Sequence, residues 1–246
     1  MSHPTVKPRR ALILTCAFLL TGAIAGSQGP VLEEELNAAI RSWEVEAVAK
    51  NLALARTVRA AEDTVSNRTV QIRGDLALAE MLRVEFEITP KSDREVRRTL
   101  GQRIDAAAKE ALRLLEGMPE TSERYRIEAD LLATMIRSDF RAKKHRKPLD
   151  GATRRALELD EGNARAWVTA AKPLVFADPE QGGDLDEAGR LLDHALELDP
   201  DLESALLLRA EVWHRQGNKE KAEADWRAAL DANPACRPAR DALGAF

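Results

Sequence analysis

Cysteine and aromatic residues are scarce in this chain of 246 residues. It contains two cysteines, and Phe, Trp and Tyr together make up 4% of it. Only Cys236 would remain if the first thirty residues were removed, which would exclude an intramolecular disulfide. Strands favour aromatic and β-branched residues, whereas this chain is rich in Ala, Leu, Glu and Arg, which favour helices. The composition therefore predicts an all-α protein that is stabilised by packing.

Motifs of the common enzyme classes are also missing. The sequence has no G-x-S-x-G, H-E-x-x-H, P-loop or G-x-G-x-x-G. His194 and His214 have no paired ligand spacing and His145 lies in a basic run, whereas a zinc site needs about four ligands. Paired carboxylates such as Asp184 and Glu187 are better interpreted as helix caps. We therefore expect no catalytic residue, no metal site and no cofactor.

The first thirty residues have the order of a secretory signal peptide. Three basic residues precede residues 11–25, which carry no charge and end in Ala23-Ile24-Ala25. Fifteen helical residues would span about 22 Å, less than the roughly 30 Å of a bilayer core, so cleavage is favoured over a retained anchor. We predict cleavage after Ala25 and a periplasmic or secreted protein, with membrane association possible but not expected afterwards.

Removal of this segment would make the protein more acidic. It would leave 34 Lys and Arg against 41 Asp and Glu, a formal charge of −7. Such a protein is not expected to bind nucleic acid. One basic cluster, residues 141–148, is interpreted as a solvated helix end that Pro148 terminates, because cations are favoured at helix C-termini. Recognition of an anionic lipid or polymer is the alternative for this cluster.

Apolar residues recur three or four positions apart over residues 31–88, which predicts helices closed by Pro90. Ser92 and Glu95 match a capping box, so we expect the next helix to begin there and to reach Gly117. A further helix is expected over about residues 122–141.

One phrase occurs twice in the second half of the chain. "RALELDEGNARAW" at residues 155–167 is nearly repeated as "HALELDPDLESAL" 39 residues later, and a weaker copy follows after another 34 residues. In the last unit Gly217 separates two helical patterns, and Ala222 and Ala229 flank Trp226 at a spacing of seven. Seven residues are almost two helical turns, so these three side chains share a stripe. The small residues allow a neighbouring helix to approach closely, which predicts a helical hairpin.

These units resemble tetratricopeptide repeats, whose pattern is thirty-four residues long. The preceding unit is longer because "KPLVFADPEQ" adds five residues, and we expect Pro173 and Pro179 to end its first helix early and to form a protruding loop. One departure is Arg209, where the pattern prefers Leu. The resemblance assigns packing between helices to Trp167, Ala188, Leu192, Ala195, Ala210, Trp213, Gly217, Ala222, Trp226 and Ala229.

The resemblance implies a right-handed α-solenoid of hairpins. Residues 1–25 are then the signal peptide, residues 26–147 a degenerate repeat-like region, and residues 148–246 the repeats with a C-terminal capping helix. The chain is similar to exported bacterial tetratricopeptide-repeat proteins, which implies a scaffold that binds another protein or an extended peptide in a concave groove. The residues assigned to the groove are Arg165, Val168, Lys172, Leu207, Glu211 and His214.

Three other functions remain open at this point. The protein could dock on a component of an uptake system, or act as a scaffold in envelope assembly. An enzyme is the least favoured, since it would need a pocket of convergent titratable groups that the sequence does not show.

Overall fold

The computed structural model describes residues 25–244, and this part of the chain consists of helices and turns without a β-strand. The predicted all-α class is confirmed. The predicted signal peptide lies almost entirely in residues 1–24, outside the described residues. Among the described helices none is long and apolar enough to cross a membrane. The α-helices are α1 (Ala25–Arg41), α2 (Val45–Ala61), α3 (Val65–Ile88), α4 (Arg94–Leu115), α5 (Ser122–Met135), α6 (Asp139–Leu159), α7 (Ala164–Phe176), α8 (Leu185–Leu198), α9 (Glu203–Arg215), α10 (Lys219–Ala232) and α11 (Arg237–Gly244).

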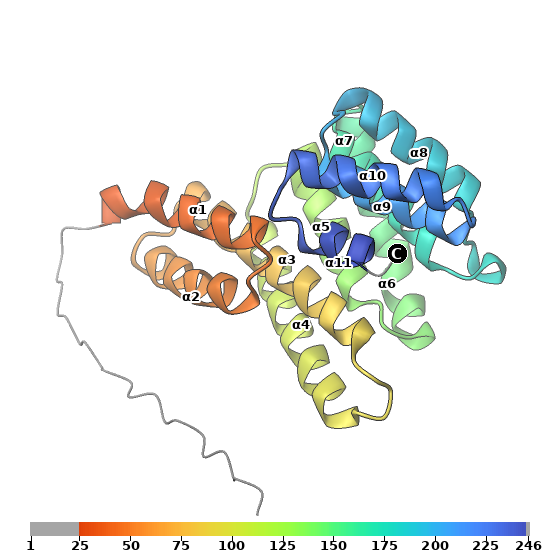
Figure 1. Ribbon diagram of the computed structural model, residues 1–246. Helices are drawn as coiled ribbons and strands as arrows, with labels where there is room; N and C mark the ends of the chain where they lie inside the picture. Colours follow the sequence, from red (N-terminus) through yellow and green to blue (C-terminus); the bar gives the residue numbers. More distant parts are fainter. Residues whose placement is uncertain (1–24, 245–246) are drawn as a thin grey trace, which may run out of the picture.

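Consecutive helices pack as hairpins, from α1 with α2 to α9 with α10, and α11 covers the last hairpin (Figure 1). The first helix of each hairpin also contacts the first helix of the next hairpin, so α1, α3, α5, α7 and α9 form one continuous inner row. The chain is therefore an all-α solenoid. Short loops between helices produce this arrangement, because each hairpin can bury its apolar face only against its neighbours.

The core of the second half is built from the small residues of the repeat pattern. Ala188, Ala195, Ala222 and Ala229 have no exposed surface and share one core cluster, in which Trp226 fills the space between helices. Leu192 and Ala210 lie fully buried in the same cluster, and Trp167 and Trp213 pack half-buried against it. Gly217 has φ +79°, a left-handed conformation that glycine adopts without steric cost and that reverses the chain between α9 and α10.

Several helix boundaries differ from the prediction. Helix α4 begins at Arg94 with Asp93 as its N-cap, so the capping box at Ser92 does not form; the Ser92 hydroxyl instead bonds the Asp93 carboxylate at 3.3 Å. The helix expected to reach residue 141 ends at Met135, because a three-residue turn separates α5 from α6. Ser138 caps the new helix by accepting a hydrogen bond from the Arg141 amide.

Two of the prolines expected to end helices, Pro148 and Pro173, lie inside them. Pro148 lies in the middle of α6, so residues 141–147 form the first half of a continuous helix rather than its end. The boundary predicted between residues 147 and 148 also falls within α6. Pro173 lies in the last turn of α7, which continues to Phe176 before the predicted loop and a short 3-10 turn at Pro179–Gln181. A proline removes one backbone donor, but hairpin packing holds each helix together around it.

Candidate functional site

The inner row of helices surrounds a concave cavity of about 540 Å³. Residues from α1, α3, α5, α7 and α9 line it, together with the end of α10. The Asn233 side chain donates a hydrogen bond to the Arg41 carbonyl at 3.2 Å, across 192 residues of chain. This contact brings the turn after α10 to the end of α1 (Figure 1), so the solenoid curves back on itself and encloses the cavity.

Lys172 occupies the centre of the inner row. Its Nζ lies 2.7 Å from Asp130 Oδ1 on α5 and 3.1 Å from Glu80 Oε1 on α3. Asp130 is 2% exposed and also accepts hydrogen bonds from Arg126 and from the Thr169 hydroxyl. The cluster therefore joins three successive hairpins through one buried carboxylate.

The electrostatics of this cluster keep Asp130 and Lys172 ionised. Burial alone would raise the pKa of Asp130, but Lys172 and Arg126 outweigh it and hold that pKa below its ordinary value. Burial would likewise lower the pKa of Lys172, yet Asp130 and Glu80 raise it above the ordinary value of lysine. Two cations and two carboxylates thus compensate each other in a site that is partly shielded from water.

The six residues assigned to the groove do not occupy equivalent places. Arg165, Val168, Lys172 and Leu207 line the cavity. Val168 is 2% exposed and belongs to the core, so it offers a partner almost no surface. Lys172 binds carboxylates of its own chain, so it joins the hairpins as well as lining the cavity.

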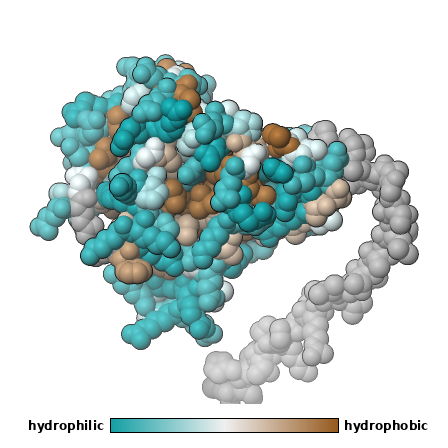
Figure 2. All heavy atoms as spheres, turned by 180° about the vertical axis from the view of Figure 1, so that it is seen from behind, coloured by the Kyte–Doolittle hydropathy of each residue, from teal (hydrophilic) through white to brown (hydrophobic). Residues whose placement is uncertain are grey.

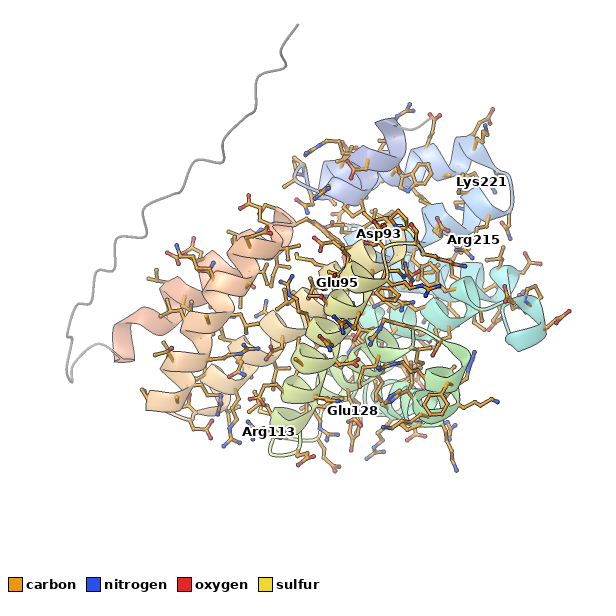
Figure 3. The ribbon with its side chains drawn as sticks, turned by 90° about the horizontal axis from the view of Figure 1, so that it is seen from below. Asp93, Glu95, Arg113, Glu128, Arg215 and Lys221 are labelled. Carbon is orange, nitrogen blue, oxygen red and sulfur yellow. The ribbon has the colours of Figure 1, made fainter. Side chains whose placement is uncertain are left out.

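The other two assigned residues, Glu211 and His214, lie outside the cavity lining. Glu211 forms an ion pair with Arg215. Arg215, labelled in Figure 3 at the end of α9, donates a hydrogen bond to the Val175 carbonyl at 2.9 Å and so fastens α9 to α7. His214 is exposed, and its ring lies 5.9 Å from that of Trp226. These two residues therefore support contacts within the solenoid.

The sequence prediction missed Trp43, which also lines the cavity. Trp43 follows α1 and has φ +57°, a left-handed conformation that is uncommon for a bulky residue. Its amide bonds the Ile40 carbonyl, and the next amide, of Glu44, bonds the Ala39 carbonyl at 3.2 Å. The same pattern surrounds Gly217 at the end of α9. A tryptophan thus occupies the turn position that glycine fills in the last hairpin.

Further ionic contacts hold the outer helices. Arg209, the departure from the repeat pattern, forms a bidentate ion pair with Asp225 at 2.8 Å and also binds Asp193, so it joins α8, α9 and α10. In the basic run, Arg141 forms a bidentate pair with Asp105, while Lys143, Lys144 and Lys147 are exposed. Within residues 25–244 no group of His, Cys, Asp or Glu side chains is arranged to hold a metal ion.

Apolar side chains gather in the centre of the face shown in Figure 2, and polar side chains cover its periphery. An exposed apolar area with a polar rim is typical of an interaction surface.

Comparison with solved structures identifies the fold. The crystal structure of TTC0263, a tetratricopeptide-repeat protein of Thermus thermophilus, is similar over 87% of this chain and 97% of that one, with a TM-score of 0.56 and 14% identity. Two others match less closely. YrrB, a tetratricopeptide-repeat protein described as having an unusual peptide-binding site, matches with a TM-score of 0.39 and 18% identity over 89% of this chain and 99% of that one. The MamA protein matches with a TM-score of 0.37 and 12% identity over 84% of this chain and 92% of that one. No family model matches the sequence, and no curated protein matches it. The chain has the fold of a tetratricopeptide-repeat protein.

Proposed function

We propose that this protein is a scaffold that binds an extended segment of another protein in the concave cavity. The fold supports this proposal, since solenoids of helical hairpins use concave surfaces for binding. The observation that carries it is Trp43, which lines the cavity in a left-handed conformation. Such strain costs about 1 to 2 kcal/mol and is retained mainly where a residue has a functional role.

The charges around the cavity indicate the character of the partner. Arg41 and Arg165 are exposed on its lining, and so are Asp199 and Asp201. Leu207 and Trp43 add apolar surface that is half-buried. A segment with one apolar anchor and charges of both signs complements this lining. Charge complementarity mainly sets specificity and the rate of encounter, so binding should weaken as the salt concentration rises.

Export is part of the proposal. The order of basic, apolar and small residues in residues 1–25 supports secretion to the periplasm or the medium. In that compartment the scaffold could serve an uptake system or the assembly of the envelope.

The experiment that tests binding is selection of peptides from a random display library against residues 26–246. Selected peptides should bind the wild type and should lose most of their affinity for the Trp43→Gly variant, because an aromatic anchor at an interface is often worth about 2 kcal/mol or more. Glycine suits the left-handed backbone at position 43, so this change removes the side chain without adding strain.

Phe140→Ser is the matched control. Phe140 lies on α6 and is 80% exposed, so it is an accessible aromatic residue outside the cavity. Selected peptides should bind this variant like the wild type. Peptides that bind all three proteins equally would contradict the assignment of the cavity.

A further inference from the structure

A second cavity lies on the other side of the Lys172 cluster. It has a volume of about 360 Å³ and is lined by residues of α3, α5, α6 and α7. Glu80, Asp130 and Lys172 line both cavities, so the ion-pair cluster forms the wall between them. Volumes of this size are typical of sites for small molecules.

Most of the exposed surface of this second cavity is apolar, although Arg146 and Asp150 also line it. Ile136, Leu149, Pro173 and Phe176 line it, and alanines such as Ala142 leave space that a larger side chain would fill. Phe176 is 60% exposed at the end of α7, and Leu149 is buried. An apolar ligand body would therefore remove existing apolar surface from water.

Arg83 is the unusual polar group of the lining. Its Nη2 binds Glu87 at 2.7 Å, whereas its Nη1 is buried and has no hydrogen-bond acceptor in the described part of the chain. A buried donor without an acceptor destabilises the folded protein, and the cost is greater when the group is charged. Nη1 itself is not exposed to the cavity, whereas 29% of the Arg83 side-chain surface is exposed, so an acceptor bound in the cavity would meet Nη1 only if the side chain turned toward it.

The charges near Arg83 favour an anionic acceptor. Glu80 and Asp130 are already compensated by Lys172. Burial lowers the pKa of Arg83, Glu87 opposes this effect, and the nearby Arg137 and Arg97 lower the pKa further. Cations thus repel one another at this end of the cavity, and a bound carboxylate would relieve the repulsion.

We propose that this second cavity binds a monocarboxylate with an apolar body, with the carboxylate at Arg83 and the hydrocarbon against Ile136, Leu149 and Phe176. This site is separate from the peptide-binding cavity and goes beyond the proposed function. Two sources share this chemistry: a free medium-chain fatty acid, and the C-terminal residue of a protein that ends in an apolar side chain.

Calorimetric titration with octanoate and with octanol tests the proposal. Octanoate should bind the wild type, and octanol, which has the same chain without the charge, should bind at least about tenfold more weakly. Arg83→Leu should weaken octanoate binding by at least about tenfold and leave octanol binding unchanged. Arg98→Leu, which alters an exposed arginine on α4, is the matched control and should bind both like the wild type.

A second pair of titrations distinguishes the sources. A peptide that ends in Leu with a free carboxylate is compared with the same peptide carrying a C-terminal amide. If the free peptide binds in an Arg83-dependent manner and octanoate does not, the site takes a protein C-terminus; if octanoate alone binds, it takes a free acid.

Two further variants locate the site. Ala142→Leu fills the cavity and should abolish binding of every ligand, whereas Trp43→Gly should leave octanoate binding unchanged, so failure here and failure of the peptide cavity can be told apart. The far-ultraviolet circular dichroism of each variant must match the wild type, and Arg83→Gln replaces Arg83→Leu if the latter does not fold. The proposal is overturned if neither octanoate nor the free peptide binds, or if binding is insensitive to Arg83 and Ala142.

Discussion

At position 43 the Trp43→Gly variant should be more stable than the Trp43→Ala variant. Inside a helix the order is the opposite, because Ala is favoured over Gly there. A left-handed conformation costs a residue with a Cβ atom about 1 to 2 kcal/mol, and Gly escapes this cost. Ala in place of Gly stabilises the folded protein by about 0.4 to 1 kcal/mol, because the unfolded Ala variant has less conformational entropy to lose. The difference leaves the Gly variant more stable than the Ala variant by about 0.5 to 1 kcal/mol.

Both variants lose the packing of the indole. Trp43 is half-buried against the core cluster of the first two hairpins. Full burial of a large apolar side chain is worth about 1.5 to 3 kcal/mol, so the loss is about 1 to 1.5 kcal/mol. Trp43→Ala should therefore destabilise the protein by that amount, and Trp43→Gly by only about 0.5 kcal/mol.

Thermal unfolding followed by circular dichroism measures the difference. For a chain of this size we expect the melting temperature of the Gly variant to exceed that of the Ala variant by about 1 to 4 °C. Ala224→Gly, at an exposed position in α10, is the control and should be destabilising by about 1 kcal/mol. If Trp43→Ala is as stable as Trp43→Gly, position 43 is not strained and the argument that Trp43 is retained for function fails.

The remaining predictions concern the core, the pH dependence and export. Ala229→Leu should destabilise the protein by about 1 to 3 kcal/mol because Ala229 is fully buried, whereas Ala224→Leu on the exposed face of the same helix should change little; equal melting temperatures would count against close helix packing. Burial raises the pKa of Asp75 to about 6. The folded protein therefore binds this proton more tightly than the unfolded chain does. As the pH falls from about 7 to 4, the free energy of unfolding of the wild type should rise by up to about 3 kcal/mol relative to that of Asp75→Asn. Parallel curves of unfolding free energy against pH for the two proteins would refute the buried charge. N-terminal sequencing of the exported protein should begin at residue 26, and a chain that begins at Met1 or is lipidated at Cys16 would contradict the signal peptide.

The sequence predicted the features of the fold that depend on local spacing. Ala222, Trp226 and Ala229 mark a helix stripe at a fixed interval, and Gly217 marks a reverse turn, so the last hairpin could be recognised from one stretch of chain. The break between α5 and α6 was missed because neither Gly nor Pro marks it, and Ser138 was not recognised as the cap of the new helix. Pro148 was misjudged because tertiary packing outweighs a single missing backbone donor.

The candidate site was harder to predict because its residues are distant in the sequence. Lys172 meets Glu80 across 92 residues, and no local pattern indicates that pair. Val168 was assigned to the groove from the resemblance to the repeat family, but the packing of α7 against neighbouring hairpins places it in the core. Trp43 gave no signal, because the glycine that usually marks a left-handed turn is absent there. Backbone strain depends on the folded arrangement, and so do ion pairs between hairpins. Neither leaves a local pattern in the sequence.

Hydrogen exchange of the wild type with and without a selected peptide tests the central claim most directly. If the concave cavity binds the peptide, amide protection should increase at the end of α1 around Trp43 and along α3, α5, α7 and α9, while the outer helices α2, α4 and α8 keep their exchange rates. Protection confined to the outer helices, or to the basic first half of α6, would place the binding surface elsewhere and contradict the account.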